Sequence, residues 1–386
     1  MNYVFLSPHF PDNFYQFCVA LRKYGVTILG LADEYYYNLR PELRDALIEY
    51  FKVEDMHNYD QLLRALGYFT FKYGKIDRID SQNEYWLETE AKLRTDFNIP
   101  GIKLDQIQAI KCKSKMKQIF IRAGVSVARG KVLKNLNEAL EFVEEVGYPI
   151  VAKPDKGVGA ADTFKIENEK QLKNFFEIKP KIDYIFEEYI KGQICSFDGL
   201  TDKEGNPLFF TSHVYQRGIM ETVNDDLHIY YYSLREIPED LIDAGLRILK
   251  AFEVKERFFH FEFFKLNDGR YVALEVNMRP PGGLTTDMFN YACDFDIYKE
   301  FANMLLYNSL SEEYIRKYHV CYVGRKFNKN YSHSHDEILK NFGSIIAHHQ
   351  HINSIFGRAL GDYGYILRYP TLNKIFEAIE FIHKLN

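Results

Sequence analysis

The sequence has few cysteines and no long apolar segment. Its five cysteines are scattered over 386 residues, and none of them forms a Cys-x-x-Cys pair. An odd number of dispersed thiols is explained most simply by reduced cysteines in a cytoplasm. No apolar run reaches membrane-spanning length, and the start MNYVFLSPHFPDN lacks the basic residues and the uninterrupted apolar core of a signal peptide. We therefore expect a cytoplasmic protein.

Blocks of one charge sign and internal repeats are missing as well. There are 49 basic and 54 acidic residues, which gives a net charge of −5. This balance argues against nucleic acid as a partner and favours small-molecule substrates. The length predicts two or three domains with substantial cores.

The order of elements predicts an α/β fold. YVFLS, NFYQFCVALRKYG and VTILGLAD read as a βαβ opening of a parallel sheet within residues 1–108. A second α/β unit follows over 109–305, beginning with a basic helix at 105–123 and containing a smaller subdomain at about 125–190. Residues 306–386 mix short strands with a terminal amphipathic helix.

FFHFEFFKLNDGRYVALEVN predicts a β-hairpin with an unusual charge pattern. Asp268-Gly269 is a strong signal for a two-residue turn, and that turn places Glu262 directly opposite Glu275. Cross-strand neighbours have Cβ atoms about 5 Å apart. Two ionised carboxylates at that distance repel by roughly 3 kcal/mol at an effective dielectric constant of 20. Something must therefore lie between or beside these charges.

Three interpretations of the carboxylate pair are open. A solvated face fits poorly, because Phe264, Leu266 and Ala273 are expected on the same face. A pair that shares one proton remains possible. A hard divalent cation is favoured, because it also explains Asn277 as a third oxygen ligand two residues further along the strand. Arg279, on the same face, would then meet an anion that the metal carries.

Three further segments carry weaker signals. In YPIVAKPDKGVGAAD, Lys153 ends a strand before a loop with Gly157 and Gly159, where backbone N–H groups can approach phosphate; alone, an ordinary loop is favoured. The lysines of IKCKSKMKQ crowd a helix start, which suggests a bound anion. In YIFEEYIKG, the carboxylates of Glu187 and Glu188 end a strand and can accept a purine amine, although a surface turn explains them equally well.

Taken together, these segments resemble the ATP-grasp superfamily, including carboxylate–amine ligases and the large chain of carbamoyl phosphate synthetase. The order is Lys113 before an AGV turn, strand-Lys-Pro with a glycine loop, EEYIKG, and finally Glu262 with E-V-N-x-R. The resemblance spans about 113–283 and implies two α+β subdomains that clasp ATP after a Rossmann-like domain. Residues 306–386 would complete the larger subdomain.

The resemblance also implies roles for individual residues. Nucleotide binding falls to Lys113, Lys153, Gly157, Gly159, Glu187, Glu188 and Ile190. Mg²⁺, or Mn²⁺ as an alternative, would be held by Glu262, Glu275 and Asn277, while Arg279 would steady an acyl phosphate. The implied reaction is ADP-forming ligation of a carboxylate to an amine, with a homodimer as one expected assembly. An acyl-phosphate-forming enzyme like carbamoyl phosphate synthetase, or a nucleotide-binding module without turnover, are the alternatives.

Two residues depart from the family pattern, and some histidines remain unassigned. Ile194 stands where a Glu usually holds the ribose hydroxyls, and Cys112 stands where Asp is common before the first lysine. We therefore expect weak ribose recognition. The histidines of SHSHDE and HHQH are weak metal candidates, because no partner spacing supports a zinc site. Their residue numbers are 333, 335, 348, 349 and 351.

Overall fold

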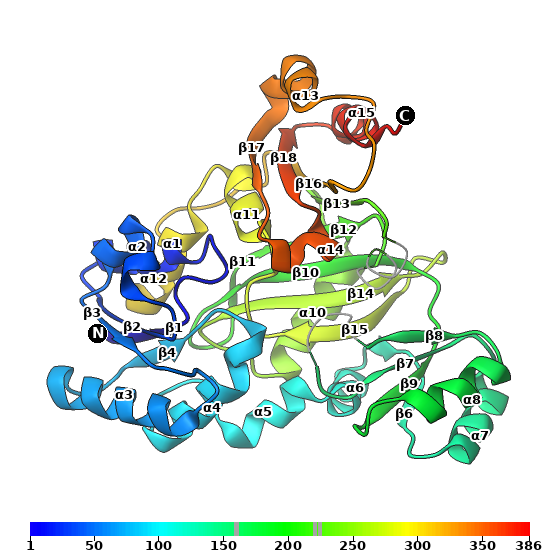
Figure 1. The fold of residues 1–386 in the computed structure, drawn as a ribbon, viewed down its shortest axis with the longest axis horizontal. Coiled ribbons are helices and arrows are strands. Elements are labelled where there is room, and N and C mark those ends of the chain that lie inside the picture. Colours follow the sequence, from blue (N-terminus) through cyan, green and yellow to red (C-terminus); the bar gives the residue numbers. More distant parts are fainter. Residues whose placement is uncertain (158–161, 219–221, 223–225) are drawn as a thin grey trace.

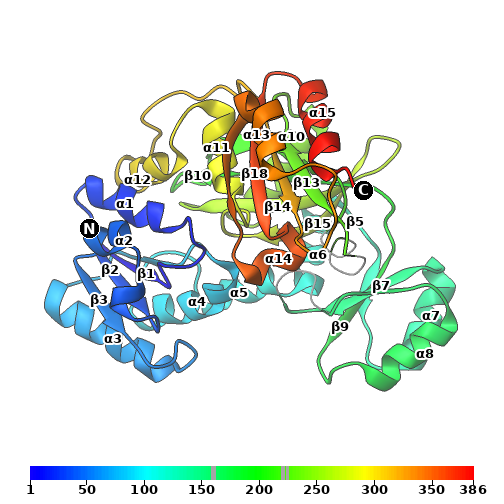
Figure 2. The same cartoon turned by 45° about the horizontal axis from the view of Figure 1, so that its top comes forward.

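Three β-sheets organise the chain in the computed structural model, which describes residues 1–157, 162–218, 222 and 226–386 (Figure 1). An N-terminal sheet and a small antiparallel sheet lie at opposite ends of the molecule, and a ten-stranded sheet lies between them (Figures 1 and 2). The predicted α/β class is confirmed.

The N-terminal sheet is parallel, with strand order β3-β2-β1-β4. Its strands are β1 (Asn2–Leu6), β2 (Thr27–Ala32), β3 (Glu49–Lys52) and β4 (Arg78–Asp80). The connecting helices are α1 (Tyr15–Lys23), α2 (Pro41–Ala46) and α3 (Tyr59–Tyr73). β1 and β2 are buried almost throughout because helices cover both faces, as is typical of parallel sheets. The predicted βαβ opening is therefore confirmed.

The central sheet has the strand order β17-β18-β16-β13-β12-β10-β14-β15-β5, with β11 paired to β10. Its strands are β5 (Ser126–Val127), β10 (Gln193–Thr201), β11 (Pro207–Thr211), β12 (His213–Tyr215), β13 (Ile229–Ser233), β14 (Phe258–Lys265), β15 (Tyr271–Asn277), β16 (His319–Arg325), β17 (Ile346–His351) and β18 (Tyr363–Tyr369). The C-terminal strands β16–β18 thus belong to the same sheet as the charged hairpin β14–β15.

The small sheet, here called the lid, is antiparallel with the order β6-β9-β7-β8. It consists of β6 (Gly130–Val132), β7 (Ile150–Pro154), β8 (Phe164–Ile166) and β9 (Tyr184–Glu188). Helices α7 (Leu136–Val146) and α8 (Glu169–Ile178) cover one face of it with an apolar core of their own (Figure 2). The sequence pattern predicts helices at 137–146 and near 169–177, and both are confirmed.

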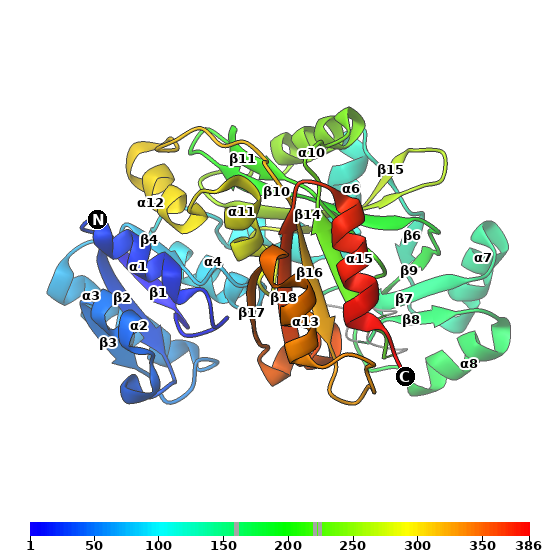
Figure 3. The same ribbon diagram turned by 90° about the horizontal axis from the view of Figure 1, so that it is seen from above.

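The remaining helices connect and cover the sheets. Two of them, α13 and α15, pack on one face of β16–β18 (Figure 3). None of the helices in the described ranges combines the length and the apolar character that a bilayer crossing requires. The helices that remain besides α1–α3, α7 and α8 are α4 (Leu87–Asp96), α5 (Leu104–Lys111), α6 (Lys113–Arg122), α10 (Glu239–Ala251), α11 (Thr285–Cys293), α12 (Ile297–Tyr307), α13 (His335–Phe342), α14 (Gly357–Leu360) and α15 (Leu372–His383).

The β14–β15 hairpin confirms the predicted carboxylate pair but not the predicted turn. The loop has three residues, 267–269, because the Leu266 N–H donates to the Arg270 carbonyl, and Gly269 takes a φ of +90°. The longer loop shifts the register by one residue as far as Ala273, which pairs with Phe263. A bulge at Leu274 then restores the predicted register, so Glu262 lies opposite Glu275.

The prediction that Ala273 lies on the charged face is wrong, because the bulge places Ala273 on the opposite face from the carboxylates. It packs in the core with Phe261 and Phe263 instead. A two-residue turn without a bulge and a three-residue loop with one give the same partner for Glu262, although they differ in every pair nearer the turn.

The predicted single helix over 105–123 is also wrong. Cys112 breaks it into α5 and α6, with φ −98° and ψ 116°. Asp155, from the residues after β7, binds the new N-terminus, because its carboxylate accepts from the Ser114 N–H at 2.7 Å and from the Ser114 hydroxyl at 2.8 Å. The anion that the crowded lysines suggest at this helix start is therefore supplied by the chain itself.

Candidate functional site

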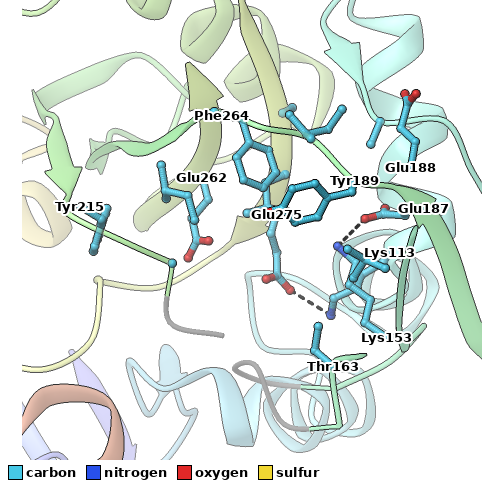
Figure 4. A pocket seen from close by; sticks show the side chains of 18 of the residues that line it. Lys113, Lys153, Thr163, Glu187, Glu188, Tyr189, Tyr215, Glu262, Phe264 and Glu275 are labelled. Carbon is cyan, nitrogen blue, oxygen red and sulfur yellow. Dashed lines mark ion pairs between the residues drawn. The ribbon is translucent and has the colours of Figure 1, made fainter. Parts of the chain in front are cut away.

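A cavity of about 300 Å³ lies between the lid and the central sheet (Figure 4). Its size falls at the lower end of the range for small-molecule pockets. Eight of the predicted site residues line it, namely Lys113, Lys153, Gly157, Glu187, Glu188, Ile190, Glu262 and Glu275. These residues come from β7, β9, β14, β15, the start of α6 and the segments that follow β7 and β9. The structure therefore gathers around one cavity residues that are up to 162 positions apart in the sequence.

On the lid side, a buried carboxylate lies between two lysines. Glu187 binds Lys153 and Lys117, each at 2.7 Å, and Lys117 also donates to the Ala128 carbonyl at 2.7 Å. Burial raises the pKa of Glu187, but the two ammonium groups outweigh it and hold that pKa below the ordinary value. Burial dominates at Lys117, whose pKa is lowered. The Glu187 carboxylate is thus occupied by cations, and a purine amine would meet the backbone beyond it.

Lys117 is a site residue that the motif comparison missed. It lies four residues after Lys113 on α6, so both lysines lie on the same face of the helix. That spacing was the available signal. Gly130 makes room for the arrangement, because a Cβ there would lie 2.9 Å from Glu187 Cγ and 3.1 Å from Lys117 Cε.

On the sheet side, each of the opposed carboxylates has its own cation. Lys113 Nζ lies 3.1 Å from a Glu275 oxygen (Figure 4). His260 Nε2 lies 3.1 Å from a Glu262 oxygen. These two contacts offset the repulsion that the sequence predicts. Burial raises the pKa of Glu262, but the hydrogen bond and charge of His260, with Arg279 further away, bring it below the ordinary value. Both carboxylates remain partly open, with side-chain exposures of 28% and 20%.

Behind Glu262 runs a buried polar network. His260 Nδ1 lies 2.5 Å from one oxygen of Asp198, and the other oxygen binds His213 Nδ1 at 2.7 Å and the Ser196 hydroxyl at 2.6 Å. Burial lowers the pKa of His260, but Asp198 reverses this and raises it to about 9. His260 is therefore a cation at neutral pH. His260 and Glu262 are two residues apart on β14. Asp198 lies directly opposite His260 on the neighbouring strand β10, and the sequence alone did not reveal this pairing.

Two predicted residues flank the cavity without lining it. Asn277 is 6% exposed and lies two residues beyond Glu275, and Arg279 Nη2 is 3.5 Å from its amide oxygen. Arg279 also donates to the Pro280 carbonyl at 2.8 Å and lies 3.8 Å from the Glu84 carboxylate of the N-terminal unit. Glu275 and Asn277 share a strand face, so two carboxylates and one amide oxygen supply the hard donors that suit Mg²⁺.

The apolar part of the cavity contains Ile194, the residue that departs from the family pattern. Ile190, Ile194 and Phe264 line this part, and Gln193 and Gln216 supply neutral polar groups. Gly192 lets the segment after β9 approach β14, because a Cβ there would lie 2.8 Å from the Lys265 carbonyl oxygen. Ile194 itself offers no carboxylate in the place of the usual Glu.

The histidine candidates lie apart from this cavity, and Gly159 lies outside the described residues. His335, at the start of α13, binds the Tyr365 hydroxyl at 2.8 Å, and His349 of β17 binds that of Tyr363 at 2.6 Å. Within the described ranges, no group of three His, Cys, Asp or Glu side chains is arranged to hold a metal ion. The C-terminal histidines thus form hydrogen bonds and ring contacts, whereas the Glu262–Glu275–Asn277 set combines two carboxylates with an amide.

Comparisons with known proteins agree with this geometry. The family model of the ATP-grasp domain matches residues 146–287. The carbamoyl phosphate synthase large chain of Clostridium acetobutylicum is 23% identical over 192 residues, which cover 48% of this chain and 18% of that protein. The L-arginine-specific L-amino acid ligase of Bacillus subtilis is 22% identical over 255 residues, covering 64% of this chain and 62% of that protein. The chain thus spans less than two thirds of each of these relatives.

A solved structure resembles the whole chain. The L-amino acid ligase from Bacillus licheniformis matches with a TM-score of 0.76 at 13% identity, covering 100% of this chain and 97% of that one. This likeness extends the agreement in fold to the N-terminal sheet and the C-terminal strands. The chain therefore contains an ATP-grasp domain and has the ATP-grasp fold, as the order of its motifs predicts.

Proposed function

We propose that the chain is an ATP-dependent ligase that activates a carboxylate as an acyl phosphate and joins it to an amine. The observation that carries this proposal is the meeting, in one cavity, of Lys113 and Lys153 with the opposed carboxylates of Glu262 and Glu275. Lysines neutralise phosphate oxygens, and paired carboxylates hold the cation that accompanies a nucleotide triphosphate. The two relatives named above, a synthase large chain and a ligase, support the same class of reaction.

In this proposal, the nucleotide lies between the lid and β14–β15. Lys113 and Lys153 face the phosphates, Gly157 allows the backbone to approach them, and the chain from Glu188 to Ile190 reads the base. Lys113 exchanges Glu275 for phosphate when the nucleotide enters, and this exchange frees the carboxylate. Residues 125–190 act as the lid of a catalytic unit at 109–305, which residues 1–108 precede and residues 306–386 complete.

Glu262, Glu275 and Asn277 would hold Mg²⁺, with Mn²⁺ as an alternative, and the ion would offset charge on the phosphates. A substrate carboxylate oxygen attacks the γ-phosphorus and ADP leaves. The amine nitrogen then attacks the acyl carbon, phosphate leaves, and the proton of the amine passes to solvent. Arg279, beside Asn277, is placed to steady the acyl phosphate. The proposed location is the cytoplasm, which suits five unpaired, buried cysteines.

ADP release with pools of amino acids and small carboxylates, offered singly and in pairs with MgATP, tests the function. We expect release that requires both a carboxylate and an amine, with phosphate formed in equal amount. MgATP binding without release in any pool would instead identify a nucleotide-binding module. Release with carboxylate alone would favour a synthase that forms an acyl phosphate without an amine acceptor.

A further inference from the structure

A second cavity, of about 480 Å³, lies at the ends of β16, β17 and β18. Its walls are the last residue of β16, the last residue of β17, the first residues of β18 and the segment 326–335 that leads into α13. It shares no lining residue with the nucleotide cavity. Its lining is basic and aromatic, which sets it apart from the mixed charges of the nucleotide cavity.

Among the described residues, the cations that line this second cavity exceed the carboxylates that balance them. Arg325, Lys326 and Lys329 line it, and no Asp or Glu among the described residues does so. Asp226 binds Lys326 at 2.8 Å and Lys329 at 3.3 Å, but its side chain is 52% exposed. Lys326 itself is only 4% exposed. A buried ammonium group with a single, solvated counter-ion leaves attraction for a further anion.

Arg325 adds a buried positive charge to the lining. The residue is 91% buried, and its Nε is closed to solvent and finds no hydrogen-bond partner in the described part of the chain. One Nη donates to the His333 carbonyl at 2.7 Å, and the guanidinium stacks on the Tyr331 ring at 3.8 Å. These contacts fix the guanidinium in the wall of the cavity, where its charge adds to that of the two lysines.

Imidazole and phenol groups complete the lining. His335 Nδ1 is tied to the Tyr365 hydroxyl at 2.8 Å, and the His351 ring packs edge-on against Tyr363 at 4.9 Å. Asp362, just before β18, accepts a hydrogen bond from the Phe327 N–H at 2.7 Å. The cavity therefore offers a guanidinium, two ammonium groups and imidazoles to a single ligand.

We propose that this cavity is a second binding site, distinct from the nucleotide site, for a small anion that carries carboxylate or phosphate groups. Arg325 and Lys326 form its buried base and Lys329 its more exposed side. The ligand displaces the solvated Asp226 from Lys326, because a charge-assisted contact inside the cavity is better shielded from water than the existing pair. The site does not depend on the proposed ligase reaction.

Isothermal titration calorimetry with inorganic phosphate and with citrate tests this site in the whole chain, in excess ADP and without added Mg²⁺, which citrate would chelate. We expect one-site binding of at least one probe. Lys326→Met and Lys329→Met should each weaken that binding by about tenfold or more, as expected for the loss of a charged contact. Lys374→Met, an exposed lysine on α15 paired with Glu377, is the matched control and should leave binding unchanged.

The two probes separate the ligand classes, since citrate alone indicates a carboxylate and phosphate alone a phosphate ester. Binding that is lost in Lys153→Ala but kept in Lys329→Met would belong to the nucleotide cavity and overturn the proposal. So would binding that no variant changes, which marks an adventitious ion only, or the absence of binding by both probes at about 1 mM. If Lys326→Met fails to fold, Lys329→Met and Arg325→Lys decide the outcome.

Discussion

Buried lysines occur in both cavities, but their counter-charges differ. In the cavity between the lid and the central sheet, Lys117 and Lys153 share the buried carboxylate of Glu187, and Lys113 binds Glu275. In the C-terminal cavity, Lys326 and Lys329 rely on Asp226, whose side chain is half exposed. The cations of the first cavity are paired with its own carboxylates, so an anionic ligand must bring a cation or take over one of these lysines. Among the described residues, the second cavity is lined by three cations and by no carboxylate.

The paired carboxylates of the first cavity can be explained in two ways, by a bound metal ion or by the cationic side chains beside them. The sequence predicts that paired carboxylates need a cation, and the structure supplies Lys113 and His260 in that place. These contacts keep the hairpin stable without metal. Both carboxylates still line the cavity, where a divalent ion could reach their oxygens.

The largest effect is expected at the enclosed carboxylate. Glu187→Gln leaves two buried lysines without a counter-charge, so we expect the free energy of unfolding to fall by about 3–5 kcal/mol. Asp226→Asn in the second cavity is the matched contrast and should cost about 1 kcal/mol or less, because its pair is open to solvent. Urea unfolding measures both. Equal losses in the two variants would remove the distinction between enclosed and solvated pairs.

The same carboxylate predicts a dependence on pH. The pKa of folded Glu187 lies below its ordinary value, so its contribution to stability is complete above about pH 4.3, the unfolded value. It is lost as pH falls further, through the folded pKa. Melting temperatures between pH 6 and pH 3 should therefore decline less steeply in Glu187→Gln than in the parent. Parallel curves would show that Glu187 does not titrate on unfolding.

A smaller effect is expected from removing a phosphate-facing lysine. MgATP at about 100 times its dissociation constant should stabilise the parent by about 2.7 kcal/mol. Lys153→Ala should lose most of this gain, because Lys153 lines the nucleotide cavity. Lys131→Ala, an exposed lysine of the lid paired with Glu145, is the control. An equal rise in melting temperature in Lys153→Ala and the control would exclude Lys153 from the phosphate site.

The smallest difference is expected between two nucleotides. Ile194 lines the cavity and has no acceptor for ribose hydroxyls, so ATP and 2′-deoxy-ATP should bind with nearly equal affinity. A site built to hydrogen-bond the hydroxyl would reject the deoxy nucleotide strongly. A hundredfold preference for ATP, which is about 2.7 kcal/mol, would mean that a neighbour such as Gln193 or Gln216 replaces the usual Glu.

The fold class and most residues of the first cavity could be predicted from the sequence, because local sequence patterns encode them. Periodicity located β1, α1, β2 and the lid helices, and the motif order brought Lys113, Lys153 and Glu262 into one site. The Asp-Gly turn rule gave the correct partner for Glu262 by an incorrect route, since the bulge at Leu274 cancels the extra loop residue. The extra loop residue and the bulge shift the strand register in opposite directions. Neither shift can be seen in the sequence, because the alternation of side chains is intact on each side of the bulge.

Contacts between distant strands and helices were beyond reach. Asp198 reaches His260 from the neighbouring strand β10, 62 residues away in the sequence, and Asp155 occupies the start of α6 from 41 residues away. Such pairings depend on tertiary placement, which local propensity does not encode. The second cavity likewise forms from residues of three strands and one loop. The histidine-rich segments can be recognised in the sequence, but the sequence does not show that the cations lie beside them.

The central claim is that the opposed carboxylates hold the metal of a nucleotide-dependent ligation. Substrate-dependent ADP release by Glu275→Gln, with Asp268→Asn in the exposed hairpin loop as control, tests it most directly. Because Glu275 also binds Lys113, some loss of stability in chelator is expected, so release is measured below the melting temperature of the variant. The account predicts a fall of orders of magnitude in Glu275→Gln and parental release in Asp268→Asn. Release at the parental rate by folded Glu275→Gln would contradict it.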